Sequence, residues 1–347
     1  MVKLGIIGST GYVGAELVRL LCQRNDIEIT TVVSNSFAGK PYSSVYPSLR
    51  GLFDKTCDTL DIDLVAEKAD YFITALPHGV ASAVIPQLLK KGKRVIDHSA
   101  DFRFRDIKVY EEWYKTAHSS PDLLGEAVYG IPELYREKIK EARLVADPGC
   151  YPTCSILGIA PALVKKLVSP KNIIIDAASG VSGAGRKSDL PYAFCETAEN
   201  FKAYGVGNHR HTPEIEQELS LLAGEDVLIS FTPHLVPMKR GMLATIYLDL
   251  AEKGLTSGDI QAVYDEYYQD EPFVRVLPAG ALAETKTVAG SNFVDISVTV
   301  DQRTNRLIVL SALDNLGKGS ASQAVQALNL MAGLPETEGL LSPGLYL

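Results

Sequence analysis

The sequence predicts an α/β protein with a Rossmann dinucleotide-binding domain and a second α+β domain that contains a mostly antiparallel sheet. A glycine-rich turn follows the first apolar run, and short apolar runs then alternate with segments of helical spacing. From about residue 151, long alternating strands replace this pattern. We expect residues 1–149 and 314–347 to form the dinucleotide-binding domain, and residues 150–313 to form a catalytic and oligomerisation domain.

Bulk composition excludes several classes of protein. With 347 residues, of which 46% are hydrophobic and 22% charged, the chain resembles an ordinary soluble protein of two domains. A formal net charge of -8 argues against general nucleic-acid binding, which requires a basic surface. No apolar run approaches the ~18 residues of a membrane span, and the first strand enters its glycine turn too early for a signal peptide. Because the five cysteines are odd in number and scattered, we expect reduced thiols, a cytoplasmic location and no membrane partner.

The first strand, 2–8, leads through a glycine turn into an amphipathic helix over 15–24. Glycines at this spacing allow a tight turn and a close approach of the backbone to a pyrophosphate, which the helix N-terminus then faces. The alternative is a glycine-rich loop without a ligand. The residues predicted to bind the dinucleotide here are Gly8, Ser9, Thr10, Gly11, Tyr12, Val13 and Gly14.

The second strand, 27–34, ends without the acidic residue that accepts hydrogen bonds from the ribose of NAD. Ser34, Ser36 and Lys40 follow instead. Hydroxyl groups and a lysine suit a 2′-phosphate, so the sequence predicts NADP(H), although an ordinary polar loop has the same composition.

Three further strands are predicted over 70–77, 94–101 and 143–149, with a helix over 80–92 between the first two. Ligands of parallel sheets gather beyond the carboxyl ends of the strands. Pro77 is therefore predicted to contact the cofactor. For His78, on the same rim, a contact with the cofactor is the alternative to the structural role that a loop histidine more often has.

Cys150 follows a Pro-Gly corner and precedes a predicted helix over 153–166. A helix N-terminus lowers the pKa of a thiol and favours the nucleophilic thiolate. Beside a nicotinamide, such a thiolate attacks an acyl carbon, and hydride then reduces the thioester to an aldehyde. The alternatives are a metal site with Cys154, for which no second pair of ligands is evident, and a buried small side chain, which suits Cys154 and Cys22 better.

The second half is predicted to form one mostly antiparallel sheet. Such a sheet packs well against a copy of itself, so we expect a homodimer or homotetramer. The final helix, 319–333, is expected to return to the first domain. The strands are predicted over 172–180, 226–237, 241–250, 292–300 and 306–316.

His209, His211 and Glu214 lie close together before and inside a predicted helix that begins near Thr212-Pro213. Two imidazoles and a carboxylate suit a general acid-base and the group that orients it. The sequence does not choose between the two histidines. A zinc site and surface histidines are the alternatives, and no metal is predicted.

Two arginines are candidates for binding an anionic substrate. Arg103 follows a strand on the sheet rim and Arg240 lies between two strands, and either is equally suited to a structural ion pair. The glycine-rich loop 179–188 contains Ser182 and Gly183, whose backbone amides are predicted to approach the nicotinamide or the substrate.

Together these motifs resemble the family of N-acetyl-γ-glutamyl-phosphate reductases, relatives of aspartate-semialdehyde dehydrogenase. The resemblance runs nearly end to end. One departure is Lys239, where a small polar residue is common, so a substrate role for this lysine is in doubt. The motifs are GSTGYVGAEL, ALPHG, DHSADFR, YGIPEL, DPGCYPT, SGVSGAG, NHRHTPEI, PHLVPMKRG and DNLGKGSASQAVQ.

The resemblance implies that Cys150 attacks a γ-acyl phosphate, that phosphate leaves, and that NADPH reduces the thioester to N-acetylglutamate semialdehyde in arginine biosynthesis. It implies acid-base chemistry by His211 or His209 with Glu214, and a position near the nicotinamide for Asn315. Aspartyl phosphate and the aminoadipyl phosphate of lysine biosynthesis are the rival substrates. A catalytically silent NADP-binding sensor is the rival of another class, which the thiol and the histidine pair disfavour.

Overall fold

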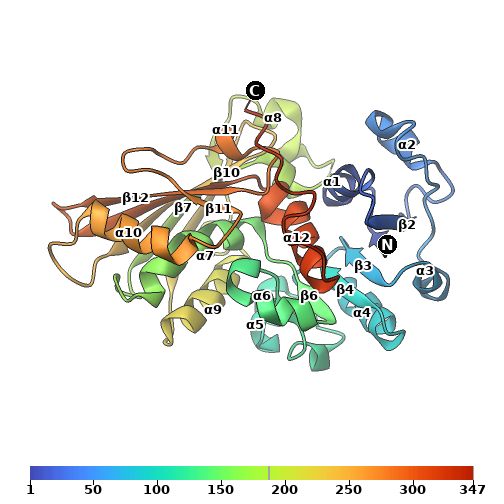
Figure 1. Cartoon of the computed structure of the whole chain (residues 1–347), viewed down its shortest axis with the longest axis horizontal. Coiled ribbons are helices and arrows are strands. Elements are labelled where there is room, and N and C mark those ends of the chain that lie inside the picture. The colour runs from blue at the N-terminus through green and yellow to red at the C-terminus, as the bar shows by residue number, and fades with distance from the viewer. Residues whose placement is uncertain (187, 347) are drawn as a thin grey trace. The chain divides into compact units, whose positions relative to one another are not determined.

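The computed structural model describes residues 1–186 and 188–346, which form two compact units (Figure 1). The first unit contains Met1–Pro148 and Ser320–Leu341, and the second contains Gly149–Gly319 and the segment from Ser342 onward. Residues 314–319 and the chain end from Ser342 therefore lie in the second unit, whereas the sequence placed them in the first. The physical reason is a set of long-range hydrogen bonds, in which Asp314 accepts from Arg240 and the Leu345 N–H donates to the Ala289 carbonyl at 2.7 Å.

The first unit is built on a six-stranded sheet in the order β2-β1-β3-β4-β6-β5, and every pair of neighbouring strands is parallel. Both faces of its central strands are buried, which explains their nearly continuous apolar sequences. The parallel sheet predicted from the alternating pattern is confirmed. Its strands are β1 (Val2–Ile7), β2 (Ile27–Val33), β3 (Tyr71–Thr74), β4 (Arg94–Asp97), β5 (Val128–Tyr129) and β6 (Leu144–Ala146).

Helices pack against this sheet and connect its strands. Side chains of α3, α4 and the strands form one apolar core cluster beside β3 and β4. The α-helices of the unit are α1 (Tyr12–Leu21), α2 (Tyr42–Val45), α3 (Ile62–Lys68), α4 (Ala81–Lys90), α5 (Ile107–Tyr114), α6 (Pro132–Glu141) and α12 (Ser322–Met331). Short 3-10 turns occur at Pro47–Leu49 and Pro121–Leu123.

The last helix, α12, returns to the first unit and packs against α6, as the sequence predicts (Figure 1). The Arg94 guanidinium donates to the Met331 carbonyl at the end of α12. Arg136 of α6 and Glu336 form an ion pair at 2.8 Å. A π-helical turn, Gly317–Ala321, precedes α12, so the helix begins at Ser322 rather than at residue 319.

The second unit is built on a seven-stranded sheet in the order β11-β12-β13-β10-β7-β9-β8. The central pairs β7–β10, β10–β13 and β12–β13 are antiparallel, whereas β7–β9 and β11–β12 are parallel. The mostly antiparallel sheet is thus confirmed, with a mixed edge. Its strands are β7 (Ile173–Gly180), β8 (Lys202–Ala203), β9 (Ile229–Val236), β10 (Met242–Asp249), β11 (Val274–Val276), β12 (Val294–Asp301) and β13 (Arg306–Leu313).

Helix α7 is the buried centre of the second unit. Every residue from Tyr151 to Leu163 is buried, and the helix contacts α9, α10 and the strands β10 and β13. The helices of this unit are α7 (Cys150–Val164), α8 (Phe194–Thr197), α9 (Thr212–Ala223), α10 (Ser257–Tyr268) and α11 (Thr285–Val288), with 3-10 turns at Val181–Ala184 and Leu190–Tyr192. No helix in the described part of the chain has both the length and the apolar character needed to span a membrane.

The turn between β1 and α1 requires glycine at two positions. Gly8 has a φ of 83°, and a Cβ placed on it would lie 2.3 Å from the Ala75 carbonyl oxygen. A Cβ on Gly14 would lie 2.2 Å from the Ser9 carbonyl oxygen. A Cβ on Gly11, in contrast, would lie 3.6 Å from its nearest neighbour, the Gly8 oxygen.

The substitution Gly14→Ala is therefore expected to lower the free energy of unfolding by about 2 kcal/mol or more, because backbone must move to admit the methyl group. Gly11→Ala is the matched control and is expected to cost less than about 1 kcal/mol. Thermal unfolding of the protein without cofactor measures both. Equal losses in the two variants would contradict this account of the turn.

Candidate active site

Cys150 is the first residue of α7, which confirms the predicted position of the thiol at a helix N-terminus. Gly149 precedes the helix in an extended conformation, and its carbonyl accepts the Thr153 N–H at 3.0 Å. Cys150 itself is partly exposed. The residue thus keeps part of its exposure and lies near the positive end of the helix dipole, which favours an anion there.

Two groups from the start of α9 hold the residue before the thiol. The Gly149 N–H donates to the buried carboxylate of Glu214 at 3.0 Å. A Cβ on Gly149 would lie 2.4 Å from Nε2 of His211, so this imidazole packs directly against the Gly149 backbone. The helix α9 begins at Thr212, as predicted, and this start places His211 and Glu214 beside Cys150.

His209 lies in a different environment from His211. Its ring contacts those of Tyr151, Tyr204, Phe231 and His211, with centroid distances from 4.9 to 5.5 Å. Burial, together with the nearby Arg210 cation, lowers the pKa of His209 to about 4. Its Nδ1 accepts the backbone N–H of His211 at 3.2 Å, which places the proton of the neutral ring on Nε2.

The segment 314–319 packs on another side of the thiol. A Cβ on Gly319 would lie 2.8 Å from the Cβ of Cys150. The Asn315 amide joins two other loops, because Nδ2 donates to Ser182 Oγ at 2.9 Å and Oδ1 accepts the Gly241 N–H at 2.8 Å. Three loops distant in the sequence therefore meet beside the first turn of α7.

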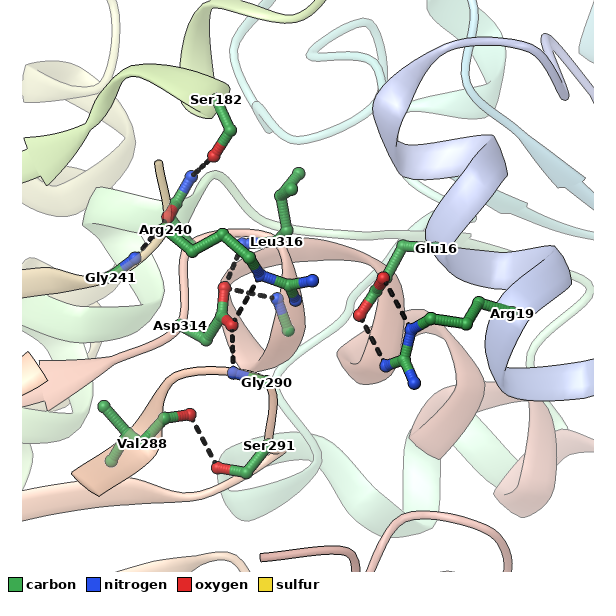
Figure 2. Close-up of polar contacts among 12 residues, drawn as sticks. Glu16, Arg19, Ser182, Arg240, Gly241, Val288, Gly290, Ser291, Asp314 and Leu316 are labelled. Carbon is green, nitrogen blue, oxygen red and sulfur yellow. Dashed lines mark hydrogen bonds and ion pairs between the residues drawn. The ribbon is translucent and has the colours of Figure 1, made fainter. Parts of the chain in front are cut away.

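Arg240 and Asp314 form an ion pair in this loop cluster. Arg240 Nε donates to Asp314 Oδ2 at 2.8 Å, and the arginine side chain keeps 22% of its exposure whereas the aspartate is fully buried (Figure 2). Lys239 is exposed, and its carbonyl accepts the Ser182 N–H at 3.2 Å. Lys187, in the predicted loop 179–188, lies outside the described residues.

Arg103 belongs to the first unit and is only 6% exposed. Its Nε donates to the Asp147 carbonyl at 2.7 Å, and Nη2 donates to the His98 carbonyl at 2.8 Å. The guanidinium thus connects the segments that follow β4 and β6. His98 Nδ1 also lies 2.8 Å from Oδ2 of the buried Asp147, a contact between two distant segments that local spacing does not indicate.

The glycine turn of the first unit is fixed by side chains that the sequence analysis missed. The hydroxyl of Tyr42 donates to the Ser9 carbonyl at 2.6 Å, and that of Tyr46 donates to the Thr10 carbonyl at 2.8 Å. Thr10 Oγ1 shares a hydrogen bond of 2.7 Å with Ser34 Oγ. The two tyrosines are more than 30 residues away in the chain, so local spacing carries no signal for them.

Other predicted cofactor residues lie at the surface of the first unit. Ser36, Lys40 and Pro77 are exposed, as is Tyr12 in the first turn of α1, and Val13 is partly exposed. His78 Nδ1 accepts the Ala100 N–H at 3.0 Å, and its ring packs against Tyr114, which fits the structural role expected for it.

The other thiols differ from Cys150. Cys154 is fully buried, and burial raises its pKa to about 12. Cys22 is only partly buried, so the expectation of a buried side chain was wrong for it, because it caps the exposed end of α1. Across residues 1–186 and 188–346, no three His, Cys, Asp or Glu side chains are grouped to hold a metal ion.

A known protein family matches the sequence of each unit. The NAD binding domain of semialdehyde dehydrogenase matches residues 3–142, and the semialdehyde dehydrogenase dimerisation domain matches residues 150–315. Among similar solved structures, aspartate semialdehyde dehydrogenase II from Vibrio cholerae is 16% identical with a TM-score of 0.73, covering 96% of this chain and 98% of that one. The enzyme from Candida albicans is 15% identical with a TM-score of 0.73, covering 96% and 99%. These likenesses concern the fold.

Curated relatives are much more similar in sequence. N-acetyl-γ-glutamyl-phosphate reductase from Acetivibrio thermocellus is 62% identical over 347 residues, which is 100% of both chains. The reductase from Desulforamulus reducens is 56% identical and also covers 100% of both chains. The one from Geobacter sulfurreducens is 54% identical and covers 98% of both.

The low pKa of His209 predicts a pH dependence of stability. The unfolded chain takes up a proton on this ring below its ordinary pKa of 6.5, whereas the folded chain does so only near 4. Stability is therefore lost as the pH falls from 6.5 to 4, by at most about 3 kcal/mol from this group. His209→Asn, which retains an acceptor near Nδ1 but does not titrate, is expected to flatten this part of the profile. Urea unfolding at pH 4 to 8 measures it, and an unchanged slope would contradict the assignment.

Proposed function

The chain belongs to the semialdehyde dehydrogenase family, and from its full-length identity with N-acetyl-γ-glutamyl-phosphate reductases we infer that it has their activity. It is an oxidoreductase of arginine biosynthesis that converts N-acetyl-γ-glutamyl phosphate and NADPH to N-acetylglutamate 5-semialdehyde, phosphate and NADP. The identity of 62% over the whole chain is the observation that carries this conclusion. The resemblance stated from the sequence motifs is thereby confirmed.

The first unit fits a dinucleotide. Gly8 and Gly14 allow backbone to pass where a Cβ has no room, and the N-terminus of α1 follows at once, where an anion is stabilised. Bound NADPH supplies the hydride of the reaction. We propose that residues 8–14 hold the pyrophosphate, that Ser34, Ser36 and Lys40 bind the 2′-phosphate, and that Pro77 contacts the cofactor.

Cys150 is the proposed nucleophile. The C–S bond to the γ-acyl carbon forms while the bond from that carbon to the phosphate oxygen breaks, and phosphate leaves. The thiol proton passes to a neighbouring base and departs with the phosphate. The thioester on Cys150 would present its carbon to the hydride that bound NADPH supplies, and the carbonyl oxygen would take up a proton. Cleavage of the C–S bond would then release the aldehyde and return the thiol of Cys150.

His211 is the proposed acid-base in these steps. The His211 imidazole lies against Gly149, next to the thiol. In His209, Nδ1 accepts the backbone N–H of His211, and the low pKa of His209 keeps the His209 ring neutral near pH 7. His209 is therefore proposed to position His211. Glu214 is proposed to position Cys150, because its carboxylate accepts the N–H of Gly149.

Arg240 is the proposed partner of the substrate carboxylate. It is partly exposed in the loop cluster beside the first turn of α7, whereas Arg103 is buried and bonded to two carbonyls of its own unit. A substrate role for Arg103 is a weaker proposal for the same reason. Ser182, Gly183 and Asn315 are proposed to lie on the nicotinamide side, since they share this cluster.

The match to a dimerisation domain indicates a homo-oligomer, and we propose a homodimer or homotetramer. Helix α7 covers one face of the second sheet, while alternate residues of β10 on the other face, among them Leu243 and Tyr247, stay partly exposed. This face is the proposed contact with the second copy. Because all five cysteines are thiols, we propose a cytoplasmic location, and the net charge of -8 disfavours nucleic-acid partners.

Turnover of three aldehydes tests the substrate. In the reverse direction, with NADP and phosphate, the enzyme is expected to oxidise N-acetylglutamate semialdehyde at least about 100-fold more efficiently than aspartate semialdehyde or the aminoadipate-derived aldehyde. Preference for either of the other two would overturn the substrate assignment. Binding of NADP without turnover of any of the three aldehydes would favour the alternative that the protein is a catalytically silent NADP-binding sensor.

Cys150→Ala is expected to abolish turnover while leaving NADP binding unchanged within about twofold, because the nucleophile is lost and the first unit is untouched. Cys154→Ala is the matched control, one helical turn later, and is expected to retain turnover with reduced stability. Residual reductase activity in the Cys150 variant, or its loss in the Cys154 variant alone, would contradict the assignment.

A further inference from the structure

The carboxylate of Asp314 is the centre of the loop cluster beside Cys150. Oδ2 accepts Arg240 Nε at 2.8 Å and also the Gly290 N–H. Oδ1 accepts the backbone N–H groups of Leu316 at 2.8 Å and Gly317 at 3.1 Å. Figure 2 shows donors from Arg240, Gly290 and Leu316 converging on the Asp314 side chain.

The Asp314 side chain acts only as an acceptor in this arrangement. Each oxygen of Asp314 accepts two N–H groups, so neither edge of the side chain has room for a donor. The side chain is fully buried, where an unpaired charge would be costly, and the Arg240 guanidinium supplies the opposite charge. The aspartate thus fixes the arginine, and backbone donors fix the aspartate.

This contact constrains the orientation of the Arg240 guanidinium. A guanidinium is planar, and its N–H donors point in fixed directions. The hydrogen bond from Arg240 Nε to Asp314 therefore sets the plane of the group and the direction of its Nη atoms. The side chain retains partial exposure, as an anion-binding group requires. A fixed fork loses less entropy when it binds a carboxylate through two parallel hydrogen bonds.

We propose that Asp314 is a positioning residue for substrate binding, which orients Arg240 toward the carboxylate of the substrate. The inference rests on the proposed function, in which Arg240 binds that group. Asp314 also accepts from Gly317, in the turn that continues to Gly319, and Gly319 packs against Cys150. The Arg240 guanidinium and the thiol therefore both contact the segment 314–319.

The substitution Asp314→Asn tests the proposal, because the amide NH₂ must face two N–H donors on one edge. Steady-state kinetics with N-acetylglutamate semialdehyde, NADP and phosphate are expected to give a KM for the aldehyde about tenfold higher, with the KM for NADP within about twofold. A loss of folded enzyme alone would lower kcat and leave both KM values unchanged.

A double-mutant cycle with Arg240→Ala identifies the route of the effect. Arg240→Ala is expected to raise the KM for the aldehyde about 50-fold, and Asp314→Asn is expected to add less than about twofold in that background. Independent multiplication of the two effects would overturn the proposal while leaving the proposed function intact. An unchanged KM in Arg240→Ala would also overturn it.

Asp295→Asn is the matched control. Asp295 is a buried carboxylate of the same unit that accepts Arg275 Nε at 2.6 Å and the Thr287 hydroxyl at 2.7 Å. Its amide variant is expected to lower stability without changing the KM for the aldehyde. An equal rise in KM would show that any broken buried pair has this effect, and would overturn the specific role of Asp314.

Two further arms keep the test decisive. If Asp314→Asn does not fold, Arg240→Lys keeps the charge without the planar fork and is expected to raise KM to within about threefold of Arg240→Ala. A wild-type KM in that variant would overturn the proposal.

If the enzyme prefers another of the three aldehydes, the proposed substrate is wrong. The same double-mutant cycle, measured with the preferred aldehyde, which also carries a carboxylate, then decides the role of Asp314. Absence of turnover with all three aldehydes would overturn both the proposed function and the proposed role of Asp314.

Discussion

The hydrogen bond from the Gly149 N–H to the buried carboxylate of Glu214 is the contact on which the geometry of the thiol depends. It holds the residue before Cys150 against the start of α9 and allows the His211 imidazole to pack where a side chain at 149 would otherwise lie. The first turn of α7 therefore begins at a fixed point. A thiol there combines access to substrate with the electrostatic support of a helix N-terminus.

A second buried carboxylate, Asp314, has a similar function on another side of the thiol. It accepts backbone donors from the turn that packs Gly319 against Cys150, and it binds the guanidinium of Arg240. Both acids act through groups that they orient. Each of these acids is fully buried, and a buried carboxyl group without hydrogen-bond donors is costly. The hydrogen bonds that satisfy the two acids also tie together the segments around the thiol.

Local patterns in the sequence predicted much of this site. The strand, turn and helix around Cys150, and the start of α9 near Glu214, depend on short-range glycine, proline and apolar spacing, which a single sequence contains. The link between Gly149 and Glu214 depends on packing of α7 against α9, so spacing alone does not contain it. Likewise, Arg103 and Arg240 look equivalent in the sequence. Only their distant partners show that Arg103 is buried and bonded to backbone carbonyls, whereas Arg240 is partly exposed and paired with Asp314.

In the proposed reaction the sulfur of Cys150 carries the acyl group. Mass spectrometry of the enzyme mixed with N-acetyl-γ-glutamyl phosphate in the absence of NADPH tests it most directly. The account predicts one N-acetylglutamyl group per chain, located on the peptide that contains Cys150 and lost as the aldehyde forms when NADPH is added. An enzyme that stays unmodified while remaining active, or an acyl group located on an exposed thiol such as Cys195 instead, would contradict it.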